Sequence, residues 1–205
     1  LVCERMVTGC RLALGGAQQY FGVTPDLACF GKAIGNGYPL SAVVGKRESM
    51  SLCDEGFFSF TFGGEALSLA AAKETIHEMQ RRNVIGHLWE QGRKLQAGFN
   101  VLARTFGVAA HTDCRGYAPR TLIGFRDETG AESLLLKSLF QQECLKRGVL
   151  FAGAQNLCLA HSEADIDETL RVYRAALAIL ADAIRCGDAA ARLEGEPVQP
   201  VFRKA

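Results

Sequence analysis

The chain has 205 residues, 48% of them hydrophobic and 22% charged, which is the composition of an ordinary globular protein rather than a disordered or collagen-like one. Lys and Arg number 23 against 22 Asp and Glu, and this balance excludes the basic surface expected of a nucleic-acid-binding protein. No uncharged apolar run approaches the roughly 18 residues of a membrane span, so we expect no membrane partner.

The first part of the chain has the pattern of short strands separated by glycine-rich turns. Gly16–Phe21 predicts one or two helical turns, and the Ala-, Leu- and Glu-rich run Glu65–Gln80 predicts a helix. Phe57–Thr61 alternates aromatic and small polar residues before Gly63 and Gly64 break the pattern. The expected strands are Leu1–Val7, Leu27–Phe30 and Leu40–Val44.

The second part predicts longer helices. Val84–Phe106 is amphipathic, and Ser133–Arg147 predicts another helix with Gly148 at its C-terminal cap. Ser162 and Asp165 match a capping box for a last helix, whose apolar residues step by 4, 3, 4, 3 and 4 and predict a buried stripe. The stripe consists of Ile166, Leu170, Tyr173, Leu177, Leu180 and Ile184. The expected strands are Val108–His111, Thr121–Phe125, Val149–Phe151 and Leu157–Leu159.

These elements predict an α/β protein in two parts. Residues 1–80 have the pattern of the late part of an α/β domain, residues 81–187 that of a small α+β domain, and residues 188–205 that of an irregular tail. The opening residues Leu1, Val2 and Cys3 already have the pattern of a buried strand. We therefore expect that a segment precedes Leu1 or that the chain is part of a longer protein.

The eight cysteines form no C-x-x-C pair, and no histidine stands at a zinc-ligand spacing from two of them, so we expect no metal site. Their neighbours are mostly apolar, which predicts reduced, mostly buried thiols in a cytoplasmic protein. Glu4, Arg5 and Arg11 stand where a signal peptide would have its apolar core, so we expect no signal peptide.

Lys32 is the residue that points most directly to chemistry. It lies just after the apolar strand Leu27–Phe30 and before the glycine-rich segment Gly35–Gly37. A lysine at the end of a core strand is expected to be partly desolvated and therefore nucleophilic, and the glycines let a bulky ligand approach the backbone. The alternative interpretation is a surface lysine in a loop.

Two nucleotide-binding motifs are excluded. A Walker A motif at Lys46 would need glycine at position 40 and serine or threonine at position 47, where the chain has Leu40 and Arg47. The glycines around Lys32 do not have dinucleotide-binding spacing either. The histidines are scattered and indicate no catalytic triad; they are His77, His87, His111 and His161.

Thr61–Gly64 comes directly before the helix expected from Glu65. A hydroxyl with free backbone N–H groups at a helix N-terminus is suited to holding a phosphate. The alternative is a threonine that only caps the helix.

Taken together, four segments resemble class III pyridoxal-phosphate (PLP) aminotransferases, and within them the glutamate-1-semialdehyde aminomutase-like branch. Gly22–Leu27 and Gly31–Leu40 resemble the family's cofactor-lysine segment. Thr8–Arg11 is similar to the end of its D-E-x-x-T-G-F-R motif, and Phe60–Glu65 resembles its G-T-x-x-G segment. The order and spacing agree, and the resemblance extends from residue 1 to about residue 187.

The resemblance implies the C-terminal part of a fold-type I PLP-dependent transferase, comprising the end of the large domain and the small domain. Lys32 would hold PLP as an internal aldimine and, once displaced by the substrate amine, would move the proton between the substrate carbon and the cofactor. Thr61, next to Phe62, would hold the cofactor phosphate across a homodimer interface. Glu4 stands where the family's aspartate pairs with the pyridine nitrogen. The reaction implied is that of an aminotransferase (transaminase) or aminomutase acting on an amino acid or an amino-aldehyde or keto substrate.

The chain also departs from the family pattern. Glu4 is one methylene longer than the family's aspartate, Arg5 replaces a glutamate and Cys10 replaces a phenylalanine. The segments that would stack on the cofactor ring and form the main phosphate-binding turn are not in this sequence. Three hypotheses follow: part of an active aminotransferase, a degenerate copy that binds cofactor weakly, or a non-catalytic dimerising module. We expect the isolated chain to be a poor enzyme.

The amino donor and acceptor cannot be read from these residues. Arg120, on an expected strand of the small domain, is a candidate partner for a substrate carboxylate. The alternative is a surface arginine.

Overall fold

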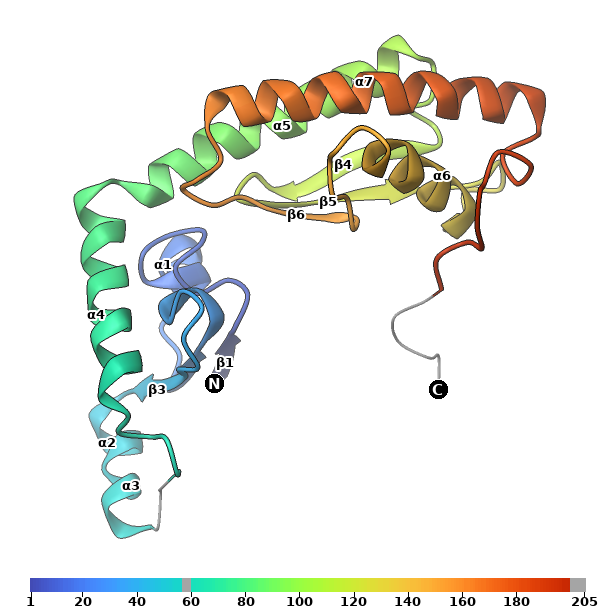
Figure 1. Ribbon diagram of the computed structural model, residues 1–205. Coiled ribbons are helices and arrows are strands. Elements are labelled where there is room, and N and C mark those ends of the chain that lie inside the picture. Colours follow the sequence, from blue (N-terminus) through green and yellow to red (C-terminus); the bar gives the residue numbers. More distant parts are fainter. Residues whose placement is uncertain (57–59, 200–205) are drawn as a thin grey trace. The chain divides into compact units, whose positions relative to one another are not determined.

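A computed structural model gives the fold of residues 1–56 and 60–199 (Figure 1). The chain divides into two compact units, Leu1–Trp89 and Glu90–Ala205. The division falls within one helix, α5 (Val84–Thr105), C-terminal to the boundary near residue 80 that the sequence suggests. No helix among the described residues is both long and apolar enough to cross a membrane.

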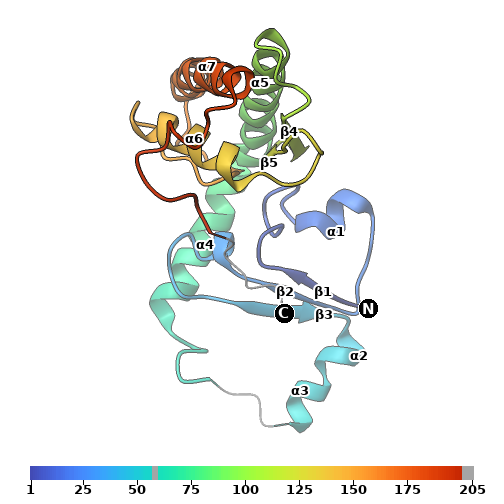
Figure 2. The same cartoon turned by 90° about the vertical axis from the view of Figure 1, so that its right-hand side faces the viewer.

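The first unit is built on a sheet with the strand order β1-β2-β3 (Figure 2). Strand β1 (Val2–Arg5) runs parallel to β2 (Leu27–Phe30), and β2 runs antiparallel to β3 (Ala42–Gly45). Arg5 pairs in register with Phe30, so the parallel strands β1 and β2 end at the same edge of the sheet. Residues that follow either strand are therefore brought to this edge, where ligands bind in many α/β sheets.

A glycine fixes the turn that follows β1. The N–H of Gly9 donates to the carbonyl of Arg5 at 2.8 Å. A Cβ at position 9 would lie 2.6 Å from that carbonyl oxygen and 2.8 Å from the Phe30 ring, so only glycine fits. Gly9 therefore allows the turn after β1 to pack closely against the buried Phe30 ring at the end of β2.

The helices of the first unit agree well with the sequence. Helix α1 (Gly16–Phe21) is as expected, and α4 (Ala66–Arg81) begins one residue late because Glu65 caps it. The Glu65 carboxylate accepts hydrogen bonds from the N–H groups of Leu67 and Ser68 at 2.6 and 2.8 Å. The idea that Thr61 caps this helix is therefore wrong. The shorter elements are η1 (Lys32–Ile34), α2 (Arg47–Met50) and α3 (Leu52–Glu55).

The second unit has an antiparallel sheet of β4 (Thr112–Tyr117), β5 (Arg120–Phe125) and β6 (Ala154–Asn156). Helices α6 (Leu134–Leu145) and α7 (Glu163–Cys186) pack on each other, and the C-terminal part of α5 contacts both through Phe99. Figure 1 shows α5 and α7 side by side, and a Cβ on Gly98 of α5 would touch Leu170 of α7. The capping box at Ser162 and Asp165 is confirmed.

Three expected strands of the second unit are wrong: residues 108–111, 149–151 and 157–159 form no strand. Each contains a buried apolar residue, Val108, Phe151 or Leu157, which packs into the core without entering a ladder. Short apolar runs do not distinguish buried loop residues from strand residues. After α5, the Val108 N–H instead closes the helix by donating to the Ala103 carbonyl at 2.9 Å.

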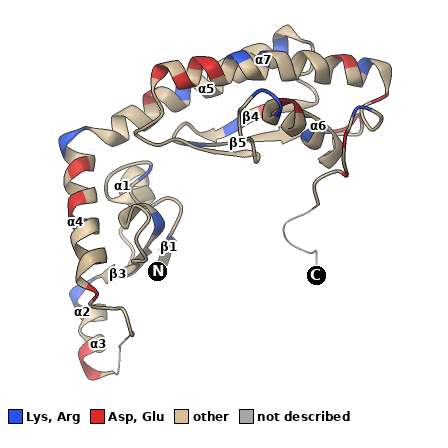
Figure 3. Ribbon diagram, viewed as in Figure 1, with Lys and Arg blue, Asp and Glu red and all other residues tan. Residues whose placement is uncertain are grey.

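The core of the second unit is an aromatic cluster under α7. Phe140 and Tyr173 both contact the fully buried Phe99, with ring centroids 5.9 and 5.8 Å from it in edge-on geometry. Tyr173 belongs to the predicted stripe, of which four members are buried and two, Leu170 and Ile184, are half-buried. Acidic and basic residues share the opposite face of α7, where they form pairs such as Glu168 with Arg171 (Figure 3).

All eight cysteines are free thiols, but most are not buried, which corrects the sequence-based expectation. Apolar neighbours in sequence do not by themselves bury a residue, since Cys186 ends a helix, Cys158 lies in a loop, and alternate residues of a strand point to opposite faces of its sheet. The buried thiols are Cys10, Cys114 and Cys144. Cys3, Cys29 and Cys53 are partly covered, and Cys158 and Cys186 are exposed.

Candidate active site

Lys32 stands at the first residue of η1, immediately beyond the end of β2. Its φ angle is +48°, in the left-handed region that non-glycine residues rarely adopt. Such a conformation costs on the order of 1 kcal/mol and is found preferentially at functional sites. The backbone thus holds this lysine in one orientation at the edge where β1 and β2 end.

The side chain of Lys32 is exposed, so the expected partial desolvation is wrong. No described residue pairs with its amine. The structure therefore leaves Lys32 free to react.

Lys46, which follows β3, is held quite differently. Its Nζ donates to Oδ1 of Asp26 at 2.7 Å, and this hydrogen bond raises the pKa of Lys46 above its usual value. The same hydrogen bond is the largest cause that lowers the pKa of Asp26 to about 2. A lysine held in its charged form by a carboxylate is a poor nucleophile, so the two lysines of this sheet differ in reactivity.

The glycine-rich segment after Lys32 forms a tight, hydrogen-bonded turn. The Lys32 carbonyl accepts from the N–H groups of Gly35 and Asn36 at 3.1 and 3.2 Å. A Cβ on Gly35 would lie 2.4 Å from the Tyr38 carbonyl oxygen, so glycine is required by the close approach of the backbone. The turn thereby fixes the backbone conformation at Lys32.

Glu4 and Arg5 occupy the last positions of the neighbouring strand β1. Glu4 is exposed, and its carboxylate accepts a hydrogen bond from the Met6 N–H. Arg5 is half-buried, and its Nε has no hydrogen-bond partner among the described residues. In the register of the sheet Glu4 lies opposite Cys29 and Arg5 opposite Phe30, which places both on the strand beside the one that leads to Lys32.

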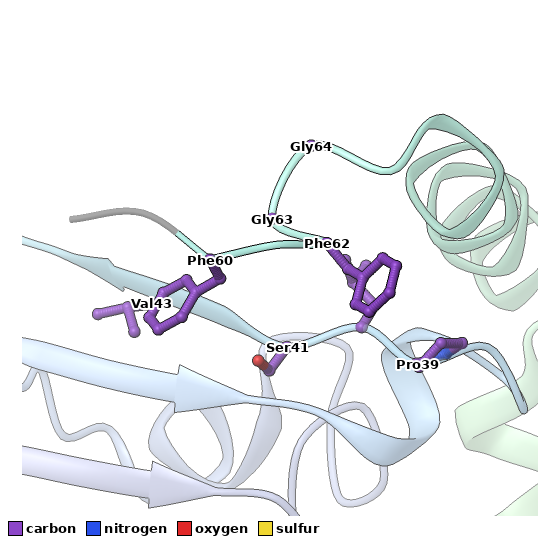
Figure 4. Close-up of a pocket in the computed structure, with 8 residues that line it drawn as sticks. Pro39, Ser41, Val43, Phe60, Phe62, Gly63 and Gly64 are labelled. Atoms are coloured by element: carbon purple, nitrogen blue, oxygen red, sulfur yellow. The ribbon is translucent and has the colours of Figure 1, made fainter.

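Thr61 and Phe62 lie in an exposed turn before α4. Phe62 lines a cavity of about 610 Å³ together with Phe60, Gly63, Gly64 and the segment Pro39–Val43 that enters β3. Figure 4 shows the loop passing over this segment, with both phenylalanine rings directed toward it. Of the expected Phe57–Thr61 alternation, residues 57–59 lie outside the described residues. The first unit therefore brings the loop with Thr61 to the chain segment that follows the Lys32 turn.

Arg120 lies in the second unit, at the first position of β5 opposite Asn156. It is half-buried, and its Nε has no hydrogen-bond partner among the described residues. Among residues 1–56 and 60–199, no three His, Cys, Asp or Glu side chains gather as they would around a metal ion.

Comparison with known proteins identifies the family. The model of the class-III aminotransferases matches residues 7–159. The chain belongs to the class-III aminotransferase family. Members of this family are PLP-dependent aminotransferases and aminomutases, so the resemblance seen in the four sequence segments is confirmed.

Curated relatives include a glutamate-1-semialdehyde 2,1-aminomutase from Syntrophobacter fumaroxidans, 35% identical over 83% of this chain and 42% of that protein. A 3-aminobutyryl-CoA aminotransferase from Cloacimonas acidaminovorans is 32% identical over 87% of this chain and 43% of that protein. The chain thus spans less than half the length of these relatives.

Solved structures give the same result for the fold. The PLP internal aldimine form of the FumI protein of Sphingopyxis sp. MTA144 superposes with a TM-score of 0.80 at 26% identity, over 90% of this chain and 44% of that one. An omega-transaminase from Sphaerobacter thermophilus shares the fold with a TM-score of 0.79. The expected α/β class, as part of a PLP-dependent transaminase fold, is confirmed.

The residues present fit PLP in their chemistry. An unpaired lysine amine is the group that bonds to the PLP aldehyde, and Lys32 offers one. The Thr61 hydroxyl lies in an exposed loop with open space beside Gly64, where a Cβ would meet no atom within 4 Å. Sequence reasoning found these residues but missed the left-handed Lys32 and the Glu65 cap. Glutamate is not among the residues usually found at an N-cap, so the sequence offered no ordinary signal for that cap.

Proposed function

We propose that the chain is the cofactor-lysine part of a PLP-dependent aminotransferase or aminomutase, and that Lys32 holds the cofactor. One observation carries this proposal: in a member of the class-III family, Lys32 presents an unpaired amine from a left-handed position at the edge where β1 and β2 end. The substrate would be a small amine, an amino acid or its aldehyde or keto counterpart.

PLP, when bound, supplies an electron sink for the substrate carbon that loses a proton. Lys32 Nζ would bind the cofactor and, when released, would accept and return that proton as a general base and acid. The Thr61 hydroxyl would bind the phosphate group, with Phe62 beside it. The second oxygen of the Glu4 carboxylate, which no described N–H occupies, would face the pyridine nitrogen.

Thr61 lies in an exposed turn, so we propose that it serves the site of a second subunit in a homodimer. The free cysteines favour a reducing compartment such as the cytoplasm.

A second candidate function, a degenerate non-catalytic copy of the fold, is favoured by one observation at β1. The Glu4 carboxylate is engaged by the Met6 N–H of its own strand end, and Arg5 adds a positive charge beside it. A misplacement of about 1 Å at a reacting centre can lower a rate on the order of 100-fold. This copy would bind PLP weakly and transfer no amine.

The two candidates are separated by a half-transamination assay on the purified chain, saturated with PLP and given a panel of amines and amino acids. The aminotransferase proposal predicts slow conversion of PLP to its amine form, below about 1 s⁻¹. This conversion should be lost in Lys32→Ala and retained in Lys73→Ala, which removes another exposed lysine. Conversion that survives Lys32→Ala would contradict the proposal, and absence of conversion in every variant would favour the degenerate copy.

A further inference from the structure

The second unit contains a cavity that the proposed function does not use. It measures about 420 Å³, within the range of small-molecule sites, and it is lined by α7, by β6 and by the residues next to that strand. Ile166, Thr169 and Tyr173 line it at the spacing of one helix face. All the described residues that line the cavity belong to the second unit.

Tyr173 is the most deeply buried polar residue at this cavity, with only 3% of its surface exposed. Its hydroxyl accepts a hydrogen bond from Nε2 of Gln155 at 2.8 Å. The other side of that amide is fixed, because Oε1 of Gln155 accepts from the Thr121 hydroxyl at 2.6 Å and from the Cys114 thiol at 3.4 Å. The Tyr173 hydroxyl is therefore the acceptor of the amide, and its own proton is left to donate.

This phenolic proton has no acceptor among the described residues. The rings of Phe99, Phe140 and Phe151 surround Tyr173 with centroids 5.8, 5.3 and 6.2 Å away, and they carry no acceptor atom. Burial raises the pKa of Tyr173, so the hydroxyl keeps its proton. Because a buried donor without an acceptor is costly in free energy, a molecule in the cavity that supplies an acceptor would be stabilised there.

The charge at the cavity favours a cationic ligand. Oδ2 of Asp165 accepts from the Ser162 hydroxyl and N–H at 2.6 and 2.8 Å, whereas Oδ1 has no partner in the described part of the chain. The hydrogen bond from the Ser162 side chain lowers the pKa of Asp165, so the carboxylate stays ionised. Neither lysine nor arginine occurs among the described residues that line the cavity. His161 also lines it, but its Nδ1 accepts the Cys158 N–H at 3.0 Å, which is the arrangement of a neutral ring.

Apolar surface joins these two polar groups. Asp165 and Tyr173 are eight residues apart on α7, which is about 12 Å along the helix axis. Helical side chains point back toward the N-terminus, which brings the long tyrosine side chain nearer to Asp165. Ile166 lies on the helix between them, and Leu95 and Leu157 also line the cavity. A ligand that fits needs a cationic end, a short apolar body and an oxygen acceptor at the far end.

We propose that this cavity binds a small amine that has an apolar body and an oxygen acceptor at its other end. The ammonium group lies against Oδ1 of Asp165, and the oxygen accepts the proton of the Tyr173 hydroxyl. A phenolic amine such as tyramine has this form. Binding depends on the second unit and requires neither PLP nor Lys32, so its failure would leave the proposed function untouched.

The test titrates the full chain, without PLP, with tyramine and two matched compounds, and follows binding by calorimetry. We expect tyramine to bind with a Kd of about 1 mM or tighter. Phenethylamine lacks the phenolic oxygen and should bind about fivefold more weakly. 3-(4-Hydroxyphenyl)propionate has a carboxylate in place of the ammonium group and should not bind. The proposal is overturned if tyramine shows no saturable binding up to about 10 mM, or if either matched compound binds as tightly as tyramine.

Two variants locate the bound amine. Tyr173→Phe keeps the ring and removes the hydroxyl, so tyramine should bind no more tightly than phenethylamine does. Asp165→Asn should weaken both amines about tenfold, whereas Glu168→Gln removes a carboxylate of the same helix that does not line the cavity and should change nothing. Unchanged binding in the first two variants would show that tyramine binds elsewhere. If Tyr173→Phe does not fold, the comparison of the three compounds on the unsubstituted chain decides the question.

Discussion

Lys32 combines an exposed amine with a left-handed backbone. The backbone conformation favours glycine at this position, whereas the proposed chemistry requires lysine. Glycine would satisfy the backbone at lower cost, since it populates positive φ freely. Only lysine supplies a primary amine. A residue that stability disfavours and chemistry requires is typical of a functional site.

Stability measurements test directly whether the backbone at position 32 is strained. We expect Lys32→Gly to be more stable than Lys32→Ala by about 1 kcal/mol, because alanine keeps the Cβ that disfavours positive φ. Urea denaturation of the two variants gives the difference, and both lose the amine, so the comparison isolates the backbone. An alanine variant as stable as the glycine variant would show that the left-handed conformation carries no strain.

At the same scale, the sequence located Lys32 but predicted its environment wrongly. Its position after an apolar strand suggested partial burial, whereas at the start of η1 its side chain is exposed. The conformation of one residue after a strand depends on the following turn, and the close packing of Gly35 on Tyr38 that shapes this turn has no signature in periodicity. Ion pairing of Lys46 with Asp26 likewise joins residues distant in sequence and required the fold to be seen.

Among the elements, α7 was the most predictable. Its capping box and apolar stripe are local patterns, and both predict the helix bounds closely. The short strands of the second unit were not predictable, since β6 has the sequence Ala-Gln-Asn and owes its pairing to β5. Gln155 of β6 is buried because its amide donates to the Tyr173 hydroxyl and accepts from Thr121, a network that only the assembled unit provides.

The stripe of α7 gives a prediction for this scale. Leu177 is fully buried, so Leu177→Asp should cost more than about 3 kcal/mol of unfolding free energy by burying an unpaired charge. Ala178, the next residue on the same helix, is exposed, and Ala178→Asp should cost less than about 1 kcal/mol. Chemical denaturation measures both. A cost for Leu177→Asp below about 1 kcal/mol would show that the stripe does not hold α7 in the core.

For the whole molecule, the family match and the fold match give the same result. Neither match measures the activity of this chain. The chain spans 42–43% of the length of its curated relatives, and it matches the transaminase fold over 90% of its own length. The four sequence segments predicted this family because together they match its motifs in order and spacing. The position of one unit relative to the other has no such local signature.

Labelling with PLP shows whether Lys32, and not simply any accessible lysine, reacts with the cofactor. The chain is incubated with PLP, reduced with borohydride to fix the cofactor on lysine, digested and mapped by mass spectrometry. Lys73 is the matched control, because it is also exposed and has no described partner, whereas Lys46 is held by Asp26. We expect Lys32 to carry most of the label at low PLP. Label spread evenly over Lys32, Lys73 and the other lysines would show that Lys32 is not the cofactor lysine.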